Sequence, residues 1–262
     1  MKIHFYKYEG AGNDFILLDN RKGGFTSHLS PALIKKLCDR RFGIGADGLM
    51  VLQLTKDYDF EMLYHNADGN AGSMCGNGGR CIAAFAKYLG VINNESNFLA
   101  VDGPHHVKIS EKDNLVSLQM IDVSEISEDG EAFVLNTGSP HYVLPVQDLA
   151  HKNVFKDGQQ IRYSPSYAEK GINVNFVEDL GDHYYVRTYE RGVEDETFAC
   201  GTGVTAVALA MARLKKQEGF IRTKLIVPGG ELNVSFNYNG SRFTEVFLEG
   251  PAKLVFEGYI EI

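Results

Sequence analysis

Two of the chain's four cysteines stand in the same short motif. Cys75 lies in "MCGNGGRC" and Cys200 in "ACGTGVTA", and each Cys-Gly-x-Gly leads into an apolar, alanine-rich run that predicts a helix. At a helix start, backbone N–H groups lack intrahelical partners and the helix dipole is positive. This environment favours a thiolate, and glycines let a ligand approach the backbone closely. The same N–H groups could bind a carboxylate.

The similarity between the two segments extends upstream of the cysteines. "YHNADGNAGSMCGNG" aligns without a gap with "YERGVEDETFACGTG", which pairs Tyr64 with Tyr189 and Asn66 with Arg191. Further upstream, "GNDF" resembles "GSPHY". We infer two related halves. If they fold about a two-fold axis, the two helix starts face each other across a cleft, with one substrate carbon between the two sulfurs. One thiolate could then remove a proton from one face while the opposite thiol returns a proton to the other, which inverts the configuration.

Other readings of the cysteines and glycines are weaker. Cys38 and Cys81 are expected to pack as buried thiols. A redox pair lacks a Cys-x-x-Cys motif, and the cysteine spacing does not suit a metal site. The segment "GIGADG" matches a dinucleotide fingerprint, but a predicted helix precedes it and a predicted strand follows, which is the wrong order for that motif. The sequence therefore predicts neither a metal nor a cofactor.

The composition limits the class of protein. Among 262 residues, 34 acidic and 26 basic side chains give a net charge of −8, which argues against a nucleic-acid-binding surface. The N-terminus lacks the pattern of a secretory signal, and no apolar stretch approaches the length of a membrane span. We expect a soluble cytoplasmic protein whose cysteines are reduced and whose partner is a small molecule.

Short β-branched and aromatic runs predict many strands, and helices are fewer. Helices are expected over 31–41, after an N-cap at Ser30, over 78–89 and over 202–216. The last is apolar on every side, which indicates complete burial. Strands are expected to begin near Ile3, Asp14, Gly48, Asp59, His105, Leu115, His141, Ile172, His183, Thr223, Glu231, Phe243 and Ala252. The pattern predicts an α/β (α+β) fold in which sheets wrap around one central helix in each half.

The combined motifs resemble the diaminopimelate epimerase family. They are "GAGNDF", "RRFGIGADG", "NADGN" with "MCGNGGRC", "GINVNF", "YERG" with "ACGTG", and the C-terminal "GPAKLVFEGYI". The resemblance implies two pseudo-symmetric domains, each a β-barrel-like sheet around a central helix, with the active site in the interdomain cleft. It implies domain boundaries of 1–119 plus 251–262 and of 120–250, and a homodimer. The implied reaction converts LL-2,6-diaminopimelate to the meso form, without PLP or metal, for lysine and peptidoglycan synthesis.

The resemblance also assigns roles to individual residues. Cys75 and Cys200 correspond to the two catalytic acid–base groups, and His141 to a position associated with catalysis. Glu190 is implied to lie at the catalytic site and to pair with an ammonium group of the substrate. Arg191 would pair with the distal carboxylate of the substrate. The further substrate contacts implied are Asn13, Asn66, Gly76, Asn77, Asn173, Gly201 and Thr202.

The chain departs from the family pattern at several positions. Ser139 stands where some members carry Asn, Gly48 where some carry Gln, and Phe256 where some carry a Tyr linked to dimer packing. Two other functions remain open from the sequence. The same chemistry could act on another amino acid, as in a histidine or proline racemase, although Arg191 argues for a second carboxylate. Alternatively, the chain could be a thiol redox protein or a non-catalytic amino-acid binder.

Overall fold

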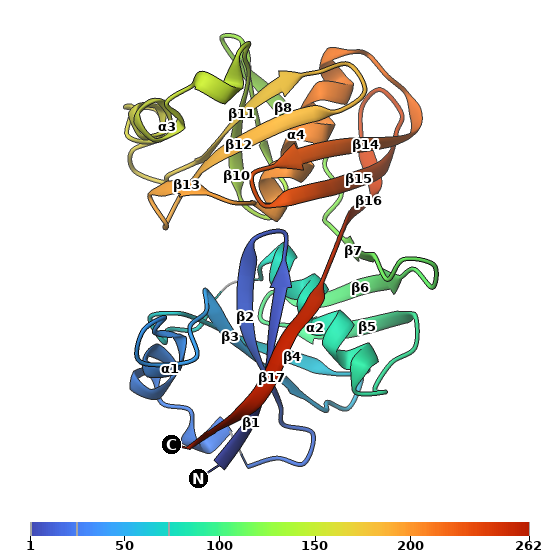
Figure 1. Cartoon of the computed structure of the whole chain (residues 1–262). Coiled ribbons are helices and arrows are strands. Elements are labelled where there is room, and N and C mark those ends of the chain that lie inside the picture. Colours follow the sequence, from blue (N-terminus) through green and yellow to red (C-terminus); the bar gives the residue numbers. More distant parts are fainter. Residues whose placement is uncertain (1, 25, 73, 262) are drawn as a thin grey trace. The chain divides into compact units, whose positions relative to one another are not determined.

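The computed structural model describes residues 2–24, 26–72 and 74–261, and the chain divides into two compact units. Unit 1 runs as far as Leu118 and resumes at Gly250, and unit 2 spans Gln119–Glu249. The return of the chain to unit 1 is made by one strand, β17 (Lys253–Glu261), which pairs antiparallel with β1 (Lys2–Gly10) (Figure 1).

The strands of the two units pair in the same order. In unit 1, β1 pairs with β2 antiparallel, β2 with β3 parallel and β3 with β4 antiparallel. In unit 2, β9, β10, β11 and β12 repeat this sequence of pairings. The strands of unit 1 after β1 are β2 (Asn13–Asp19), β3 (Gly48–Gln53), β4 (Glu61–Asn66), β5 (Glu95–Ala100), β6 (Gly103–Ile109) and β7 (Val116–Gln119). The expectation of two related halves is confirmed at the level of the pairing pattern.

The correspondence continues to the end of each sheet. A parallel pair, β4 with β5, is followed by antiparallel β6 and β7 in unit 1, and parallel β12 with β14 is followed by antiparallel β15 and β16 in unit 2. The strands of unit 2 are β8 (Ile126–Asp129), β9 (Ala132–Asn136), β10 (Pro140–Pro145), β11 (Asn173–Asp179), β12 (Tyr184–Glu190), β13 (Asp195–Thr197), β14 (Gly219–Val227), β15 (Gly230–Tyr238) and β16 (Phe243–Gly250).

Each unit holds one long helix inside its sheet and one shorter helix outside. The long helices are α2 (Gly76–Tyr88) and α4 (Gly201–Leu214), and the shorter ones are α1 (Pro31–Cys38) and α3 (Val154–Arg162). In unit 1, α2 contacts β1, β2, β3, β6 and β17, and in unit 2, α4 contacts strands from β9 to β15 (Figure 1). Eleven residues of α4 are buried, as its all-round apolar sequence predicts. The expected architecture of sheets around a central helix is confirmed.

The expected strands are all present, but several elements were not predicted. The strands β5, β8, β9 and β13 are short or flanked by polar residues, so their periodicity is weak. The helix α3 was missed because Gly158 lies in its interior, where glycine ordinarily disfavours a helix. That glycine is required by packing, since a Cβ there would lie 2.4 Å from the Cβ of Tyr189.

The first helix ends three residues earlier than the expected range of 31–41. Ser30 caps its N-terminus as predicted, because its side chain accepts a hydrogen bond from the Leu33 N–H. At the other end Asp39 has extended backbone angles, and its carboxylate accepts hydrogen bonds from the N–H groups of Arg41 and Phe42, both at 2.7 Å. The carboxylate thus stabilises a turn that competes with further helix. No helix within 2–24, 26–72 and 74–261 is long and apolar enough to cross a membrane.

Candidate active site

Cys75 occupies the N-cap of α2 in unit 1. Its backbone is extended (φ −114°, ψ 124°), and the Gly79 N–H donates to its carbonyl at 2.7 Å. The side chain is partly exposed, whereas Gly76 and Asn77 in the first turn are buried. The thiol therefore stands at the positive end of a buried helix, in the environment that the sequence predicted for it.

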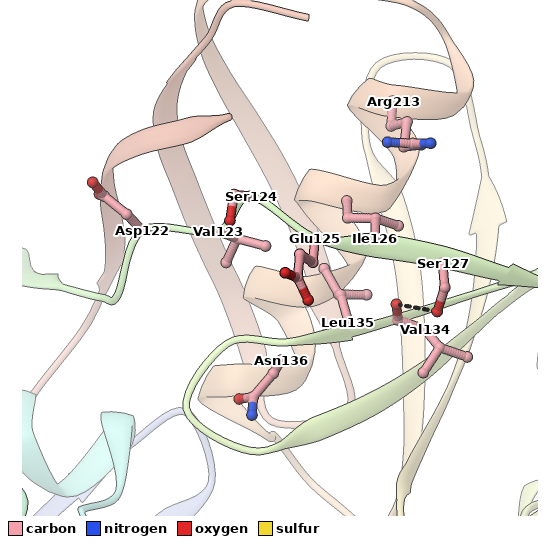
Figure 2. A pocket seen from close by; sticks show the side chains of 10 residues that line it. All are labelled: Asp122, Val123, Ser124, Glu125, Ile126, Ser127, Val134, Leu135, Asn136 and Arg213. Carbon is pink, nitrogen blue, oxygen red and sulfur yellow. Dashed lines mark hydrogen bonds between the residues drawn. The ribbon is translucent and has the colours of Figure 1, made fainter. Parts of the chain in front are cut away.

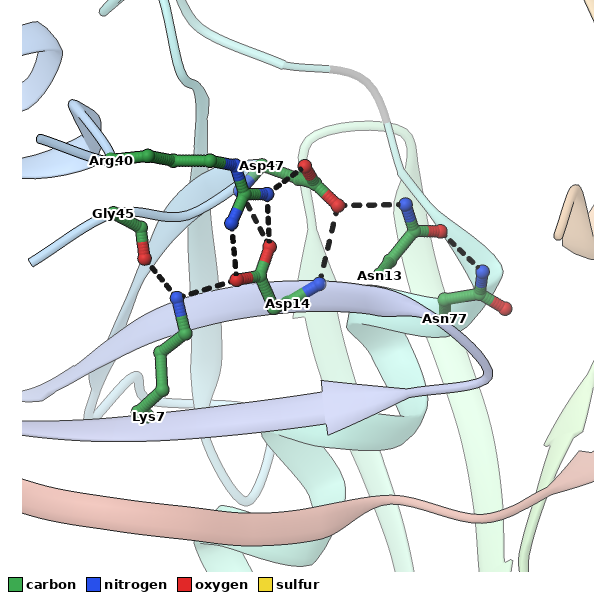
Figure 3. Close-up of polar contacts among 7 residues, drawn as sticks. All are labelled: Lys7, Asn13, Asp14, Arg40, Gly45, Asp47 and Asn77. Carbon is green, nitrogen blue, oxygen red and sulfur yellow. Dashed lines mark hydrogen bonds and ion pairs between the residues drawn. The ribbon is translucent and has the colours of Figure 1, made fainter. Parts of the chain in front are cut away.

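Asn13 at the start of β2 and Asn77 in the first turn of α2 lie next to each other (Figure 3). The Asn77 amide donates to Asn13 Oδ1 at 2.5 Å, and the Asn13 amide donates to Asp47 Oδ2 at 2.9 Å. The carboxylate of Asp47 also accepts from the Asp14 N–H at 3.2 Å, which fixes it at the start of β2. Asp47 thus determines which way the Asn13 amide faces. The side chain of Asn66, by contrast, is exposed at the end of β4 and takes no part in these two hydrogen bonds.

A cluster of charged side chains lies next to this pair of amides and is joined to it through Asp47. Figure 3 shows Asp14 between Lys7 of β1 and Arg40, with Arg40 also reaching Asp47. The Asp14 carboxylate lies 2.7 Å from Lys7 Nζ and 2.7 Å from an Arg40 nitrogen. Although burial raises the pKa of Asp14, hydrogen bonds from Arg40 and Lys7 outweigh it and lower that pKa to about 2. The cluster therefore stays ionised at neutral pH and holds the β2 start rigid. It borders a surface hollow of about 430 Å³ that Val255 also lines.

Cys200 occupies the equivalent place in unit 2, at the N-cap of α4. Its backbone angles, φ −117° and ψ 109°, are close to those of Cys75, and the Val204 N–H donates to its carbonyl at 2.9 Å. Its side chain is 8% exposed. Its sulfur lies 3.5 Å from Thr202 Oγ1, and Thr202 is itself tied to the sheet because its carbonyl accepts from Thr137 Oγ1 at 2.8 Å.

A chain of hydrogen bonds connects Cys200 to His141. Thr202 Oγ1 lies 3.2 Å from Ser139 Oγ, and Ser139 Oγ lies 2.9 Å from His141 Nε2. The other ring nitrogen, Nδ1, lies 3.1 Å from the amide nitrogen of Asn175. The orientation of this amide is fixed because the same nitrogen donates to the Tyr142 carbonyl at 3.1 Å, while the amide oxygen accepts from Thr188 Oγ1 at 3.0 Å. Nδ1 is therefore the acceptor, and Nε2 carries the proton and donates to Ser139.

The direction of this chain follows from its fixed ends. Ser139 Oγ accepts from His141 Nε2 and from the Asn173 amide at 3.0 Å, so its own proton is available for Thr202. The Thr202 hydroxyl can then donate to the Cys200 sulfur. Burial lowers the pKa of His141 to about 3, with Arg191 adding to the effect, and the ring is fully buried. His141 is therefore neutral at physiological pH and acts as a hydrogen-bond donor, not as a protonated imidazolium acid.

Arg191 and Glu190 stand at the end of β12 near this chain. The Arg191 N–H donates to Asn173 Oδ1 at 2.9 Å, while its guanidinium is exposed and donates to the Lys170 carbonyl at 3.1 Å. Glu190 is half-buried and accepts from Thr197 Oγ1 at 3.0 Å. The structure therefore gathers Cys200, Thr202, His141 and Asn173 into one network, with Arg191 joined to it through its backbone.

The other two cysteines are buried thiols, as expected. Burial raises the pKa of Cys38 to about 11 and raises that of Cys81 further. In unit 2 a separate hollow of about 480 Å³ lies between β8, β9 and α4 (Figure 2). It is lined by Glu125 and Arg213 among others, and by neither Cys75 nor Cys200. Over residues 2–24, 26–72 and 74–261, no group of three or more His, Cys, Asp or Glu side chains could hold a metal ion.

The sequence reasoning missed the residues that orient the site. Asp47 lies within "GADG" and Asn175 within "GINVNF", both quoted as motifs without a role for these side chains. Ser139 was noted only as a departure from the family pattern, yet it has three hydrogen-bonding partners: His141, Thr202 and Asn173. For each of these residues the available sequence signal was a polar side chain just before or within a segment that forms a buried strand.

Solved structures with the same fold come first among the comparisons. A phenazine biosynthesis protein of the PhzF family from Bacillus anthracis matches with a TM-score of 0.79 and 12% identity, over all of both chains. A hydroxyproline epimerase from Agrobacterium vitis matches with a TM-score of 0.71 and 12% identity, over 99% of this chain and 92% of its own. This chain therefore shares its two-unit fold with a PhzF-family protein and with a hydroxyproline epimerase.

Sequence comparison identifies the family within that class. The family model described as diaminopimelate epimerase matches residues 5–125 and 133–255. A diaminopimelate epimerase from Flavobacterium psychrophilum is 52% identical over 97% of this chain and 99% of its own, and one from Chlorobaculum tepidum is 41% identical with the same coverage. The chain belongs to the diaminopimelate epimerase family, as its motifs predicted, and is therefore an isomerase.

Proposed function

We propose that this chain performs its family's reaction, the conversion of LL-2,6-diaminopimelate to the meso form in lysine biosynthesis, with Cys75 and Cys200 as the two acid–base groups. The observation that supports this assignment is the matched placement of the two cysteines. Each is the N-cap of a buried helix, with nearly the same extended backbone and a buried glycine after it. We propose that the two units are the two epimerase domains and that each contributes one of the two catalytic cysteines.

The reaction requires one thiolate and one thiol. The thiolate takes the α-proton, the electron pair of the broken C–H bond stays on the α-carbon, and the opposite thiol delivers its proton to the other face. N–H groups at the helix starts, among them those of Gly76, Asn77, Gly201 and Thr202, would bind the α-carboxylate and stabilise the charge that develops on it. Because two thiols supply both proton transfers, the reaction needs neither PLP nor a metal.

The remaining substrate groups meet side chains of both units. Arg191 offers an exposed guanidinium suited to bidentate pairing with the distal carboxylate, and Glu190 offers a carboxylate for an ammonium group. Asn13, Asn66 and Asn173 would contribute amide hydrogen bonds. His141 acts in this scheme through Ser139 and Thr202, as a neutral donor that orients the hydroxyl next to Cys200.

The cellular setting and assembly are also part of the proposal. Reduced thiols suit the cytoplasm, and meso-diaminopimelate would serve as a peptidoglycan precursor as well as a lysine precursor. A homodimer is favoured by the apolar residues that β17 exposes, Val255 at 55%, Phe256 at 47% and Tyr259 at 62%, since exposed apolar groups on one strand suit an interface.

The proposed function is tested with LL-diaminopimelate in deuterium oxide. The wild-type protein should incorporate deuterium at the α-carbon and produce the meso isomer, while proline and histidine are left unchanged. Cys75→Ala and Cys200→Ala should each lower kcat by about 10²–10⁴-fold, the usual contribution of a general acid or base. Cys38→Ala, which removes a buried thiol from α1, is the matched control and should remain active.

Each outcome separates this function from the alternatives. Full turnover in both Cys75→Ala and Cys200→Ala would exclude the two-thiol mechanism. Binding of diaminopimelate without deuterium incorporation would indicate a binding protein. A thiol redox protein would cycle between disulfide and dithiol during function, whereas the epimerase should be inactive as the disulfide and recover with a reductant.

A further inference from the structure

The amides of Asn13 and Asn77 belong to a longer chain of hydrogen bonds that has a charged group at each end. At one end the Arg80 guanidinium donates to Asn77 Oδ1 at 2.9 Å. The Asn77 amide donates in turn to Asn13 Oδ1 at 2.5 Å. At the other end the Asn13 amide donates to Asp47 Oδ2 at 2.9 Å (Figure 3). We call these four residues the amide chain.

The two charged ends fix the direction of the amide chain. A guanidinium can only donate, so the atom of Asn77 that faces Arg80 must be the amide oxygen, and the amide nitrogen of Asn77 then faces Asn13. A carboxylate can only accept, so the atom of Asn13 that faces Asp47 must be the amide nitrogen. The oxygen and nitrogen of an amide have nearly the same shape, so its partners decide its orientation. Here the cation and the anion require the same orientation of both amides.

Both end groups are themselves held in place by further hydrogen bonds. Asp47 Oδ1 accepts from Arg40 at 2.7 Å, and Asp47 Oδ2 accepts from the Asp14 N–H at 3.2 Å as well as from the Asn13 amide. Arg80 is fully buried, and its guanidinium also donates to the Gly76 carbonyl at 3.3 Å. Neither end can turn away from its amide without breaking these bonds, so the amide chain is anchored on both sides.

Unit 2 makes the equivalent contact with different residues. The alignments of the two halves pair Asn13 with Ser139 and Asn77 with Thr202. Asn13 and Ser139 each follow a glycine with positive φ, and the hydroxyls of Ser139 and Thr202 lie 3.2 Å apart. A polar side chain at the start of a strand therefore meets a polar side chain in the first turn of the long helix in both units. The repetition of this contact indicates that the pair serves the site and not only the packing of unit 1.

The groups that orient the pair differ between the units. In unit 2 the donors to Ser139 are His141 and Asn173, at 2.9 and 3.0 Å, and both are neutral. The residue of α4 aligned with Arg80 is Thr205, which is buried and whose hydroxyl donates within its own helix at 2.9 Å. Unit 1 thus orients its pair with a cation and an anion, whereas unit 2 uses neutral donors.

We propose that Asp47 and Arg80 are positioning residues for the epimerase reaction, and that they hold the amides of Asn13 and Asn77 in the single orientation that the substrate requires. This inference rests on the proposed function, in which Asn13 and Asn77 contact the substrate. Asp47 and Arg80 touch no substrate in this scheme. A flipped amide presents an oxygen where the site needs an N–H group, which replaces an attraction by a repulsion. Loss of either end group should therefore lower kcat/KM and not only stability.

The test is a double-mutant cycle on kcat/KM with LL-diaminopimelate as substrate. Asp47→Asn keeps the shape of the side chain, but its amide can donate as well as accept, so the Asn13 amide is free to flip. We expect kcat/KM to fall about tenfold or more, the contribution of one hydrogen bond to a charged group. Because Asp47 acts through Asn13, the same substitution in an Asn13→Ala background should change kcat/KM by less than about twofold.

A control and a second pair of variants accompany the cycle. Asp59→Asn is the matched control, because the Asp59 carboxylate lies in the same unit and accepts from Ser96 Oγ and the Asn97 N–H, both at 2.9 Å. It should leave kcat/KM within about twofold of wild type. At the other end of the amide chain, Arg80→Met should lower kcat/KM, and Arg80→Lys should restore part of it because lysine is also a pure donor.

Two kinetic results would overturn the inference. Equal losses from Asp47→Asn with and without Asn13 refute it, because Asp47 would then act independently of that amide. A loss no larger than that of Asp59→Asn also refutes it. If Arg80→Met does not fold, the Asp47 cycle gives the decision.

Absence of diaminopimelate turnover in the wild-type protein would instead reject the proposed function. The inference is then decided by NMR of the Asn13 side-chain amide, identified by its loss in Asn13→Ala. The amide proton that Asn13 donates to Asp47 should resonate downfield in the wild-type protein and move upfield in Asp47→Asn. A resonance that does not move refutes the inference.

Discussion

Removing the Ser139 hydroxyl should disturb the orientation of the groups around Cys200 and leave Cys200 itself in place. Its hydroxyl accepts from His141 Nε2 at 2.9 Å and from the Asn173 amide at 3.0 Å, and it lies 3.2 Å from Thr202 Oγ1. In Ser139→Ala the Asn173 amide retains the Pro140 carbonyl at 3.0 Å. The Nε2–H group of fully buried His141, however, loses its acceptor.

The expected magnitude follows from these partners. A buried donor left without an acceptor costs about 1–3 kcal/mol, so the free energy of unfolding should fall by that amount. Thr202 also loses the neighbour that directs its proton toward Cys200. A loss of about 1.4 kcal/mol in the transition state lowers kcat about tenfold, and we expect an effect of that order on kcat with little change in KM.

The assay combines urea unfolding with steady-state epimerase kinetics. Ser127→Ala is the matched control, because Ser127 lies in the same unit on exposed β8 and its hydroxyl donates to the Val134 carbonyl at 3.3 Å, away from His141 and Thr202. Its unfolding free energy should change by less than about 0.5 kcal/mol. If Ser139→Ala is as stable and as active as Ser127→Ala, the hydrogen-bond chain from His141 to Cys200 has no energetic role.

Two further predictions concern stability. Asp14→Asn should destabilise the protein at pH 7 by about 3 kcal/mol, because it leaves buried Lys7 without its carboxylate. The folded-state pKa of Asp14, about 2, lies below its ordinary 3.8, so its stabilisation is present above pH 4 and is lost between pH 4 and 2. The difference from wild type should shrink over that window in urea unfolding, and a pH-independent difference would contradict the assignment. Gly158→Ala should destabilise by about 1–3 kcal/mol in thermal or urea unfolding, despite the better helix propensity of alanine, because its Cβ would overlap Tyr189. Gln160→Ala, exposed on the same helix, is its control, and equal stability of the two variants would show that the packing relaxes freely.

Much of the fold could be predicted because it depends on local patterns. Apolar alternation marks the strands, Ser30 and Pro31 mark the start of α1, and the all-apolar run after Cys200 marks a helix buried on every side. The repeated Cys-Gly-x-Gly motif indicated two matched helix starts, and the pairing order of the strands bears out the two related halves. Such signals are readable because the residues that produce them lie within a few positions of each other.

The elements that escaped prediction depend on contacts between distant segments. The helix α3 tolerates Gly158 because Tyr189 of β12 packs against it, and no local pattern carries that information. The orientation of the Asn13 amide is likewise decided by Asp47, 34 positions away. Sequence reasoning assigned a candidate contact to Asn13 but could not say which partner would hold it.

By itself, the sequence determined the family, the reaction class and the two cysteines on which the proposed chemistry depends, because these follow from residue types at short spacing. Only the tertiary structure decided the charge and tautomer of the groups around them. His141 is neutral and donates through Nε2 because Asn175 and full burial leave it no alternative. Arg80 is a fully buried cation on α2, and buried Thr205 occupies the aligned position on α4. Burial and hydrogen-bond direction are properties of the surroundings in space, so the spacing of residues along the chain does not contain them.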